Sequence, residues 1–327
     1  MENPVVVRSL TKEFKVPVRD TGLKASVQSL FKRQFSMVEA VRDISFDLEP
    51  SEIVGFLGPN GAGKTTTIKM LTGLLHPTNG NALVLGYPPW ERSKDLLRRI
   101  SLVMGQRNNL AWDLPALDSF ALNKAIYGIP DDVFAERQAR YIETLDLGGL
   151  VNKPVRNLSL GERMKMEIAG ALLHGPEVLF LDEPTIGLDV TMQRRLRNFL
   201  LEYNADTGAT ILLTSHYMAD VAALAQRVIV IDHGQILFDG PLAQLSDRFS
   251  THKKLTIEAT DLPPDLESWG KVLERNPYRA VLEVPRDSVS LVTTQVLSEA
   301  TVTDLSIEEP PLEDVIDRVF TTHNDST

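Results

Sequence analysis

Short apolar runs alternate with helical stretches from Val41 to about Asp239, and such runs predict buried strands. The predicted strands are Ile44–Leu48, Ile53–Leu57, Ile100–Met104, Val178–Leu181, Thr210–Thr214 and Val228–Ile231. The predicted helices are Ala116–Tyr127, Asp132–Leu145, Gly161–Leu173 and Thr191–Tyr203. This alternation is typical of an α/β fold with a largely parallel sheet. Between Gln106 and Leu158 the pattern is helical without a convincing strand, which predicts a helical insertion into the sheet domain.

The composition changes near Gly240-Pro241, where we expect a domain boundary. Beyond it, half-buried strands are predicted from alternating apolar and polar positions at Lys254–Ala259, Val272–Arg275, Ala280–Val284 and Val302–Ile307. Helical patterns accompany them at Ser288–Ala300 and Leu312–Phe320. The expected organisation is a main domain over residues 1–240 and a small accessory α+β domain, ferredoxin-like in topology, over residues 241–327.

Composition limits the functions that the chain can have. It has 327 residues, no cysteine and a formal charge of −10, which excludes disulfides and disfavours general nucleic-acid binding. No apolar run is long enough to cross a bilayer, so a membrane role is expected to need a partner chain. The charge is uneven: residues 241–327 hold 16 acidic and 8 basic side chains, a net of −8, whereas residues 11–35 hold 6 basic and 2 acidic, a net of +4.

The segment Gly58–Thr65 fits the phosphate-binding pattern G-x-x-x-x-G-K-[ST]. It follows the apolar run Ile53–Leu57 and precedes a helical start at Thr66–Leu71, as a loop that wraps N–H groups around phosphate oxygens should. Lys64 is expected to reach the outer phosphates, and the Thr65 hydroxyl to bind Mg²⁺. The predicted phosphate-binding residues are Gly58, Pro59, Asn60, Gly61, Ala62, Gly63, Lys64, Thr65 and Thr66.

Two adjacent carboxylates, Asp182 and Glu183, follow the predicted strand Val178–Leu181. Open α/β sheets bind ligands at the carboxyl ends of their strands. Alone, the pair could be a solvated strand end. Together with a phosphate loop it predicts that Asp182 serves Mg²⁺ and that Glu183 is the general base that polarises water.

The segment Leu158–Glu162, with the sequence LSLGE, is similar to the signature of ATP-binding cassette (ABC) ATPases, usually LSGGQ. Gln106 after a strand, the sequence Gly187-Leu188-Asp189 and His216 stand in the order that this family keeps. The resemblance covers about Val5 to Leu245. It implies a P-loop ABC ATPase domain with a mostly parallel sheet core, an antiparallel N-terminal subdomain and a helical signature subdomain at about residues 107–165, using ATP and Mg²⁺.

The family resemblance also implies residue roles. Two ATPase subunits, here expected to be a homodimer, pack head to tail, and the signature residues Ser159, Gly161 and Glu162 contact the ATP of the other subunit. Asp189 would support the interface, His216 would bridge γ-phosphate and water, and Gln106 would bind Mg²⁺ or water. Each residue has an ordinary alternative when taken alone: Asp189 suits an N-cap and His216 a polar strand end.

The chain departs from the family pattern in three places. Leu160 replaces a glycine and Glu162 a glutamine in the signature. An insertion at 15–40 follows Phe14, the residue expected to stack on adenine, although Phe31 or Phe35 could replace it. Four apolar residues of the insertion share one face of a predicted basic helix, which would either pack on the sheet edge or contact the permease or lipid headgroups: Leu23, Val27, Leu30 and Phe31.

The overall pattern most resembles the ATPase subunit of ABC-2-type exporters, including drug-efflux systems. The tail Pro310-Pro311-Leu312-Glu313-Asp314-Val315 is similar to an ending common in that subgroup. Members work with separately encoded membrane permease subunits on the cytoplasmic face of the plasma membrane, so membrane contact is expected through the permease. Alternatives are an ABC importer ATPase or a non-transport ABC ATPase acting on ribosomes or in DNA repair.

Overall fold

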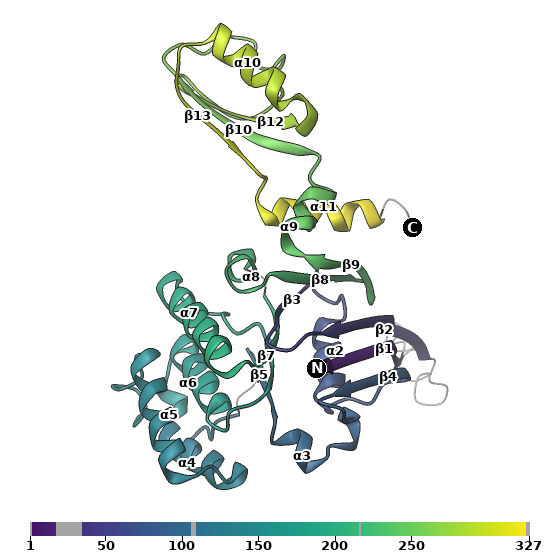
Figure 1. The fold of residues 1–327 in the computed structure, drawn as a ribbon, viewed down its shortest axis with the longest axis vertical. Coiled ribbons are helices and arrows are strands. Elements are labelled where there is room, and N and C mark those ends of the chain that lie inside the picture. Colours follow the sequence, from purple (N-terminus) through teal and green to yellow (C-terminus); the bar gives the residue numbers. More distant parts are fainter. Residues whose placement is uncertain (1, 18–34, 106–108, 216, 325–327) are drawn as a thin grey trace, which may run out of the picture. The chain divides into compact units, whose positions relative to one another are not determined.

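The computed structural model describes residues 2–17, 35–105, 109–215 and 217–324. Contacts divide the chain into two compact units, Met1–Asp239 and Gly240–Thr327. The centre of the first unit is a six-stranded sheet in the order β5-β6-β7-β3-β8-β9 (Figure 1). Its strands are β3 (Ile53–Leu57), β5 (Ile100–Met104), β6 (Val178–Asp182), β7 (Thr210–Thr214), β8 (Arg227–Asp232) and β9 (Gln235–Pro241).

The sheet from β5 to β8 is parallel, as the alternating pattern predicts. Strands β3, β6 and β7 are buried along their whole length, which explains their continuous apolar sequences. In the register of β6 and β7, Asp182 lies opposite Thr214. The polar residues at the carboxyl ends of these central strands are therefore brought to one edge of the sheet.

A second, antiparallel sheet has the order β2-β1-β4 and confirms the expected N-terminal subdomain. Its strands are β1 (Val5–Pro17), β2 (Phe35–Leu48) and β4 (Asn79–Val84). The pairing of β1 with β2 continues to Pro17 and Phe35, so both ends of the 15–40 insertion form an extended hairpin. The residues proposed for a basic helix, together with Phe31, lie outside the described part of the chain.

The helices of the first unit are α2 (Lys64–Leu71), α3 (Lys94–Leu97), α4 (Ala116–Tyr127), α5 (Asp131–Thr144), α6 (Leu160–Leu172), α7 (Val190–Thr207) and α8 (Met218–Leu224). The bounds of α4 are those predicted, and α5 and α6 each begin one residue earlier than expected. Between Asn109 and Leu158 the described residues are helical or irregular, without a strand, as expected for a helical insertion.

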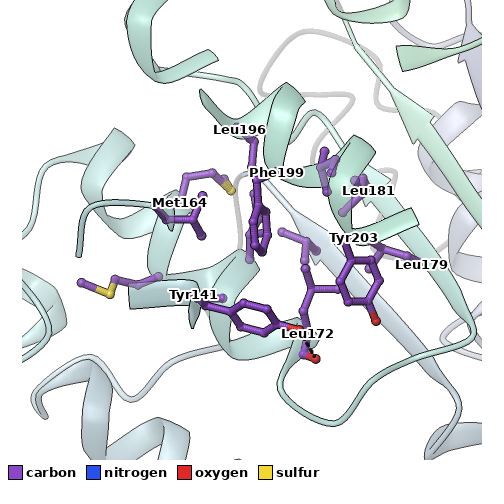
Figure 2. Close-up of a cluster of buried hydrophobic side chains, with 14 of the residues drawn as sticks. Tyr141, Met164, Leu172, Leu179, Leu181, Leu196, Phe199 and Tyr203 are labelled. Atoms are coloured by element: carbon purple, nitrogen blue, oxygen red, sulfur yellow. Dashed lines mark hydrogen bonds between the residues drawn. The ribbon is translucent and has the colours of Figure 1, made fainter. Parts of the chain in front are cut away.

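A shared core holds α5, α6 and α7 against the sheet (Figure 2). The rings of Tyr141 and Phe199 meet edge to face, with centroids 5.3 Å apart. The Tyr203 hydroxyl donates to the carbonyl of Pro176 over 3.2 Å, so this buried polar group is satisfied. Met164 and Leu196 fill the space between α6 and α7. The core thereby fixes the starting points of α6 and α7, which carry the signature and Asp189.

The second unit contains a four-stranded antiparallel sheet in the order β11-β12-β10-β13, with the helix α10 beside it (Figure 1). The strands are β10 (His252–Ala259), β11 (Lys271–Asn276), β12 (Arg279–Pro285) and β13 (Val302–Glu308), and the helices are α9 (Leu242–Phe249), α10 (Val289–Glu299) and α11 (Leu312–Asn324). Helix α10 links β12 to β13, and β10 lies between these two strands, as in a split βαβ unit.

The ferredoxin-like expectation holds for this strand order and for α10 but is wrong for the other crossover. The connection from β10 to β11 contains no helix, because it carries Pro263 and Pro264, which oppose helix formation. The buried side chains Leu266 and Trp269 of this connection join the core of the sheet. Helix α9, which was not predicted from the sequence, packs on α11.

Candidate nucleotide site

The phosphate loop leaves the end of β3 where two other backbone segments approach it closely. A Cβ at Gly58 would lie 2.1 Å from the carbonyl oxygen of Ile231. A Cβ at Gly63 would lie 2.5 Å from the carbonyl oxygen of Ala40, and Gly63 has a φ of +109°. Both positions therefore require glycine, one for close approach and the other also for its left-handed backbone.

The loop encloses a small hollow of about 130 Å³. The hollow lies at the N-terminus of α2, where backbone N–H groups and the helix dipole favour an anion. Its lining residues are Asn60, Gly61, Ala62, Gly63, Lys64, Thr65, Thr66 and Glu183. The size and lining suit a terminal phosphate group. Glu183, the predicted general base, lies in the wall of the hollow beside the predicted phosphate loop.

Lys64 is buried at the base of this hollow. Its Nζ donates to the carbonyl oxygens of Gly58 at 2.5 Å and Pro59 at 3.0 Å. Burial lowers the pKa of Lys64, and the negative charges of Glu183 and Asp182 oppose that shift. A phosphate would offer this ammonium group charged acceptors in place of neutral carbonyls, which makes stronger hydrogen bonds.

Asp182 is buried and held by two hydroxyl groups. Thr65 Oγ1 donates to Asp182 Oδ2 and Thr214 Oγ1 donates to Asp182 Oδ1, both over 2.8 Å. Hydroxyl and carboxylate oxygens are the donors that Mg²⁺ prefers, so Thr65 and Asp182 fit this ion. The described residues contain no cluster of three or more His, Cys, Asp or Glu side chains that could hold a metal ion.

Glu183 follows Asp182 in a strained backbone conformation, with a φ of +57°. Its N–H donates to Thr214, to Oγ1 over 3.0 Å and to the carbonyl oxygen over 3.2 Å. The chain turns sharply here and brings Glu183 to the wall of the phosphate hollow. Strain maintained by surrounding hydrogen bonds at this point agrees with a functional role.

The signature segment forms the N-terminus of α6, and Ser159 is its N-cap. The Glu162 N–H donates to Ser159 Oγ over 3.2 Å, and the Ser159 N–H donates to Glu162 Oε2 over 2.8 Å. These two bonds form a capping box, and the bond from the Ser159 backbone lowers the pKa of Glu162. Glutamate and glutamine both serve in such a box, so the departure at Glu162 preserves the start of the helix.

The second departure, Leu160, packs on the turn that precedes α7. A Cβ at Gly187 would lie 2.3 Å from Leu160 Cδ2, and Gly187 has a φ of +74°, so glycine suits this position beneath Leu160. A Cβ at Gly161 would lie 3.0 Å from Leu188 Cδ2. Asp189 Oδ1 accepts from the N–H of Met192 over 2.9 Å, so the N-cap interpretation of Asp189 is confirmed. The signature and the Gly187–Asp189 turn are thus in direct contact within one chain.

The structure brings the phosphate loop, Asp182 and Glu183 together but does not bring the signature to them. Of the predicted nucleotide contacts, seven do not line the phosphate hollow of their own chain: Phe14, Gly58, Pro59, Ser159, Gly161, Glu162 and Asp189. Gln106 and His216 lie outside the described residues. Phe14 belongs to β1, pairs with Val38 of β2 and is partly exposed.

Sequence reasoning missed Thr214, which fixes Asp182 and Glu183, and Asp220, a buried carboxylate near the same strand ends. Thr214 ends the predicted strand Thr210–Thr214. A signal was therefore present, since ends of neighbouring parallel strands share one edge of the sheet. It required knowing that β7 neighbours β6.

A family model described as ABC transporter matches residues 41–186, and one described as EvrA-like ABC transporter, C-terminal domain, matches residues 251–308. The linearmycin resistance ATP-binding protein LnrL of Bacillus subtilis (strain 168) is 30% identical over 293 residues, covering 86% of this chain and 94% of LnrL. Nod factor export ATP-binding protein I of Cupriavidus metallidurans is 32% identical over 243 residues, covering 73% of this chain and 78% of the relative.

Among solved structures, the dimeric post-hydrolysis state of the ATP-binding cassette MJ0796, bound to ADP and Pi, has the same fold. Its TM-score is 0.60 at 21% identity, covering 72% of this chain and 98% of that chain. Within the part of the chain that the structure describes, no helix has both the length and the apolar composition to span a bilayer. Sequence and fold agree that the chain belongs to the ATP-binding proteins of ABC transporters and is an ABC ATPase.

Proposed function

We propose that this chain hydrolyses ATP to drive export through a separately encoded membrane permease. The observation that supports hydrolysis best is the phosphate hollow, where Lys64, Thr65 and Glu183 meet beside Asp182. Export is supported by relatives whose names refer to Nod factor export and to linearmycin resistance. The LnrL match also extends over most of this chain.

In the proposed reaction, the N–H groups of the loop and the Lys64 ammonium bind the phosphates, while Thr65 and Asp182 hold Mg²⁺. Bound Mg²⁺ would neutralise charge on the phosphate oxygens. Glu183 orients a water molecule in line with the γ-phosphate and accepts its proton. On the family resemblance alone, we propose that Gln106 assists at the metal and that His216 assists at the γ-phosphate.

Phe14 is the proposed adenine-stacking residue. Ala40 contacts the phosphate loop at Gly63, and Val38, the partner of Phe14, lies two residues before Ala40 on β2. At about 3.4 Å per residue, Phe14 is about 7 Å along the strand from the loop contact, whereas Phe35 is about 17 Å away. Phe14 is 36% exposed, and Lys12 Nζ lies over its ring, 5.3 Å from the centroid, so the remaining exposed part of the ring is the part that a base could reach.

The working unit is proposed to be a head-to-tail homodimer that encloses ATP between its subunits. The signature and Asp189 stand at the N-termini of α6 and α7, which pack beside each other. Helix N-termini attract phosphate, and Ser159 is exposed, yet neither lines the hollow of its own chain. A second subunit would supply the phosphate that this surface is suited to bind.

Mixing two inactive variants tests this arrangement. Lys64→Ala removes the phosphate-binding ammonium, and Ser159→Asp keeps a good N-cap while it places a negative charge against the γ-phosphate. We expect each variant alone to lose ATP turnover by at least about tenfold. A mixture should recover activity, because a mixed dimer contains one site with an intact loop from one chain and an intact signature from the other.

The matched control mixes wild-type chain with a chain that carries both substitutions, since such a mixed dimer has two damaged sites. Turnover is measured at increasing concentration of the second partner. A mixture of the single variants that stays as inactive as its parents would contradict the composite site, whereas loss of turnover in Lys64→Ala alone would still support ATP hydrolysis.

A groove of about 690 Å³ beside α4 and α6 is the proposed permease contact. Ile126 and Leu74 in its wall are 58% and 49% exposed, and Arg92, Lys94 and Arg98 add positive charge at its rim. An exposed apolar groove with a charged rim suits an amphipathic segment of a partner. We propose that a cytoplasmic segment of the permease occupies it.

Ile126→Glu places a charge in an apolar contact. In cells that contain the permease, the amount of this variant recovered with salt-washed membranes should therefore fall several-fold. ATP turnover of the purified chain should be unchanged. The matched control is Leu122→Glu, since Leu122 is 56% exposed on the same helix but does not line the groove. Equal recovery of both variants would contradict the groove as the contact.

A further inference from the structure

A buried carboxylate lies behind the catalytic loop and has no place in the reaction described above. Asp220 is in the first turn of α8, and its side chain is 1% exposed. One oxygen, Oδ2, accepts from Thr185 Oγ1 over 2.5 Å and from Ser215 Oγ over 2.9 Å. The other oxygen, Oδ1, lies 3.6 Å from Arg197 Nε and has no hydrogen-bond partner among the described residues.

These contacts join three parts of the site. Thr185 lies two residues after Glu183, in the turn that leads to Asp189. Ser215 follows the last residue of β7, Thr214, which holds Asp182 and the Glu183 N–H. A single carboxylate oxygen therefore connects the segment after the general base to the end of the neighbouring strand.

The Ser215 hydroxyl also holds Tyr217, the residue that precedes α8. The Tyr217 N–H donates to Ser215 Oγ over 3.0 Å, while that hydroxyl donates its own proton to Asp220. Arg197 of α7 donates to the carbonyl of Ala219 over 3.0 Å and provides the positive charge that faces Asp220. A buried carboxylate without such partners would be costly, so these contacts hold Asp220 in one position.

We propose that Asp220 is a positioning residue that sets the distance between Glu183 and the polar end of β7 for ATP hydrolysis. It acts through Thr185 and Ser215 and does not line the phosphate hollow. The inference rests on the proposed role of Glu183. Displacing a general base by about 1 Å costs about 100-fold in rate, whereas phosphate binding by the loop does not depend on this spacing.

Two substitutions test the contact from opposite sides. Thr185→Val removes the hydroxyl but preserves the shape of the side chain, and Asp220→Asn removes the negative charge that strengthens the hydrogen bonds from Thr185 and Ser215 and that faces Arg197. We expect each to lower kcat about 10- to 100-fold while the KM for ATP and the ATP-induced rise in melting temperature stay as in the wild type. The double variant should be no slower than the slower single variant, because both remove one connection.

Thr185→Ser is the matched control, since it retains the hydroxyl, and it should keep kcat within about threefold of the wild type. The inference is overturned if Thr185→Val turns over at the wild-type rate. It is also overturned if Asp220→Asn loses ATP binding and folded protein in proportion to its loss of turnover. Glu183→Gln measured in parallel separates the two proposals: full turnover in that variant contradicts the role of Glu183 itself.

Discussion

Glu183→Gln should bind Mg·ATP with wild-type affinity and lose at least about 100-fold in turnover, the range expected when a general base is removed. The substitution keeps the size of the side chain in the phosphate hollow and leaves Lys64 and Thr65 in place. The backbone bonds from Glu183 to Thr214 are also retained, because they involve its N–H. The substitution removes the carboxylate charge, and with it the capacity to accept a proton from water.

The measurement combines steady-state phosphate release with the molar mass of the chain in the presence of Mg·ATP. The variant should accumulate as an ATP-bound dimer, since ATP that is enclosed between two subunits and not hydrolysed would continue to hold them together. Glu202→Gln, an exposed position on α7, is the control and should behave as the wild type. Normal hydrolysis by Glu183→Gln would show that another group activates the water.

Sequence alone predicted the parts of the site that are contiguous in the chain. The loop from Gly58 to Thr65 and the pair Asp182-Glu183 each carry their chemistry within a few residues, beside an apolar strand of recognisable length. The signature was found for the same reason. Local patterns also placed β3, β5 and β7 at their observed bounds, because these strands are fully buried or nearly so and have continuous apolar sequences.

The supporting contacts could not be predicted in this way, because they join distant positions. Thr214 meets Asp182 only through the register of β6 and β7, and Asp220 reaches Thr185 across 35 positions. Leu160 looked like an unexplained departure until the structure placed it over Gly187. Each of these contacts depends on strand order or helix packing, which short-range patterns do not contain.

The irregular connections were also harder to predict, because their structure depends on contacts with distant parts of the chain. The strand and helix patterns predict a ferredoxin-like α+β domain, yet the β10–β11 connection uses Leu266 and Trp269 to cover the sheet without a helix. The helix predicted within the 15–40 insertion lies outside the described residues and stays a prediction, while the described ends of the insertion continue β1 and β2 as a hairpin.

Gly58→Ala should impair both folding and ATP binding, because the added methyl group meets backbone. A Cβ at this position would lie 2.1 Å from the Ile231 carbonyl oxygen, and no side-chain rotation can relieve that contact. Either β8 or the loop must move. Overpacking of this kind lowers the free energy of unfolding by about 1–3 kcal/mol.

The displaced loop should also bind ATP about 10- to 100-fold more weakly, the effect of losing one hydrogen bond to a charged group. Thermal unfolding and titration with a fluorescent ATP analogue measure the two effects separately. Gly148→Ala is the matched control, because a Cβ there meets nothing within 4 Å; it should leave the affinity unchanged and the melting temperature equal or slightly higher. If Gly58→Ala matched this control in both measurements, the close approach of the loop to β8 would not constrain the site. A loss of affinity without a loss of stability would show that the loop moves and the sheet does not, because Lys64 and its hydrogen bonds to Gly58 and Pro59 belong to the loop alone.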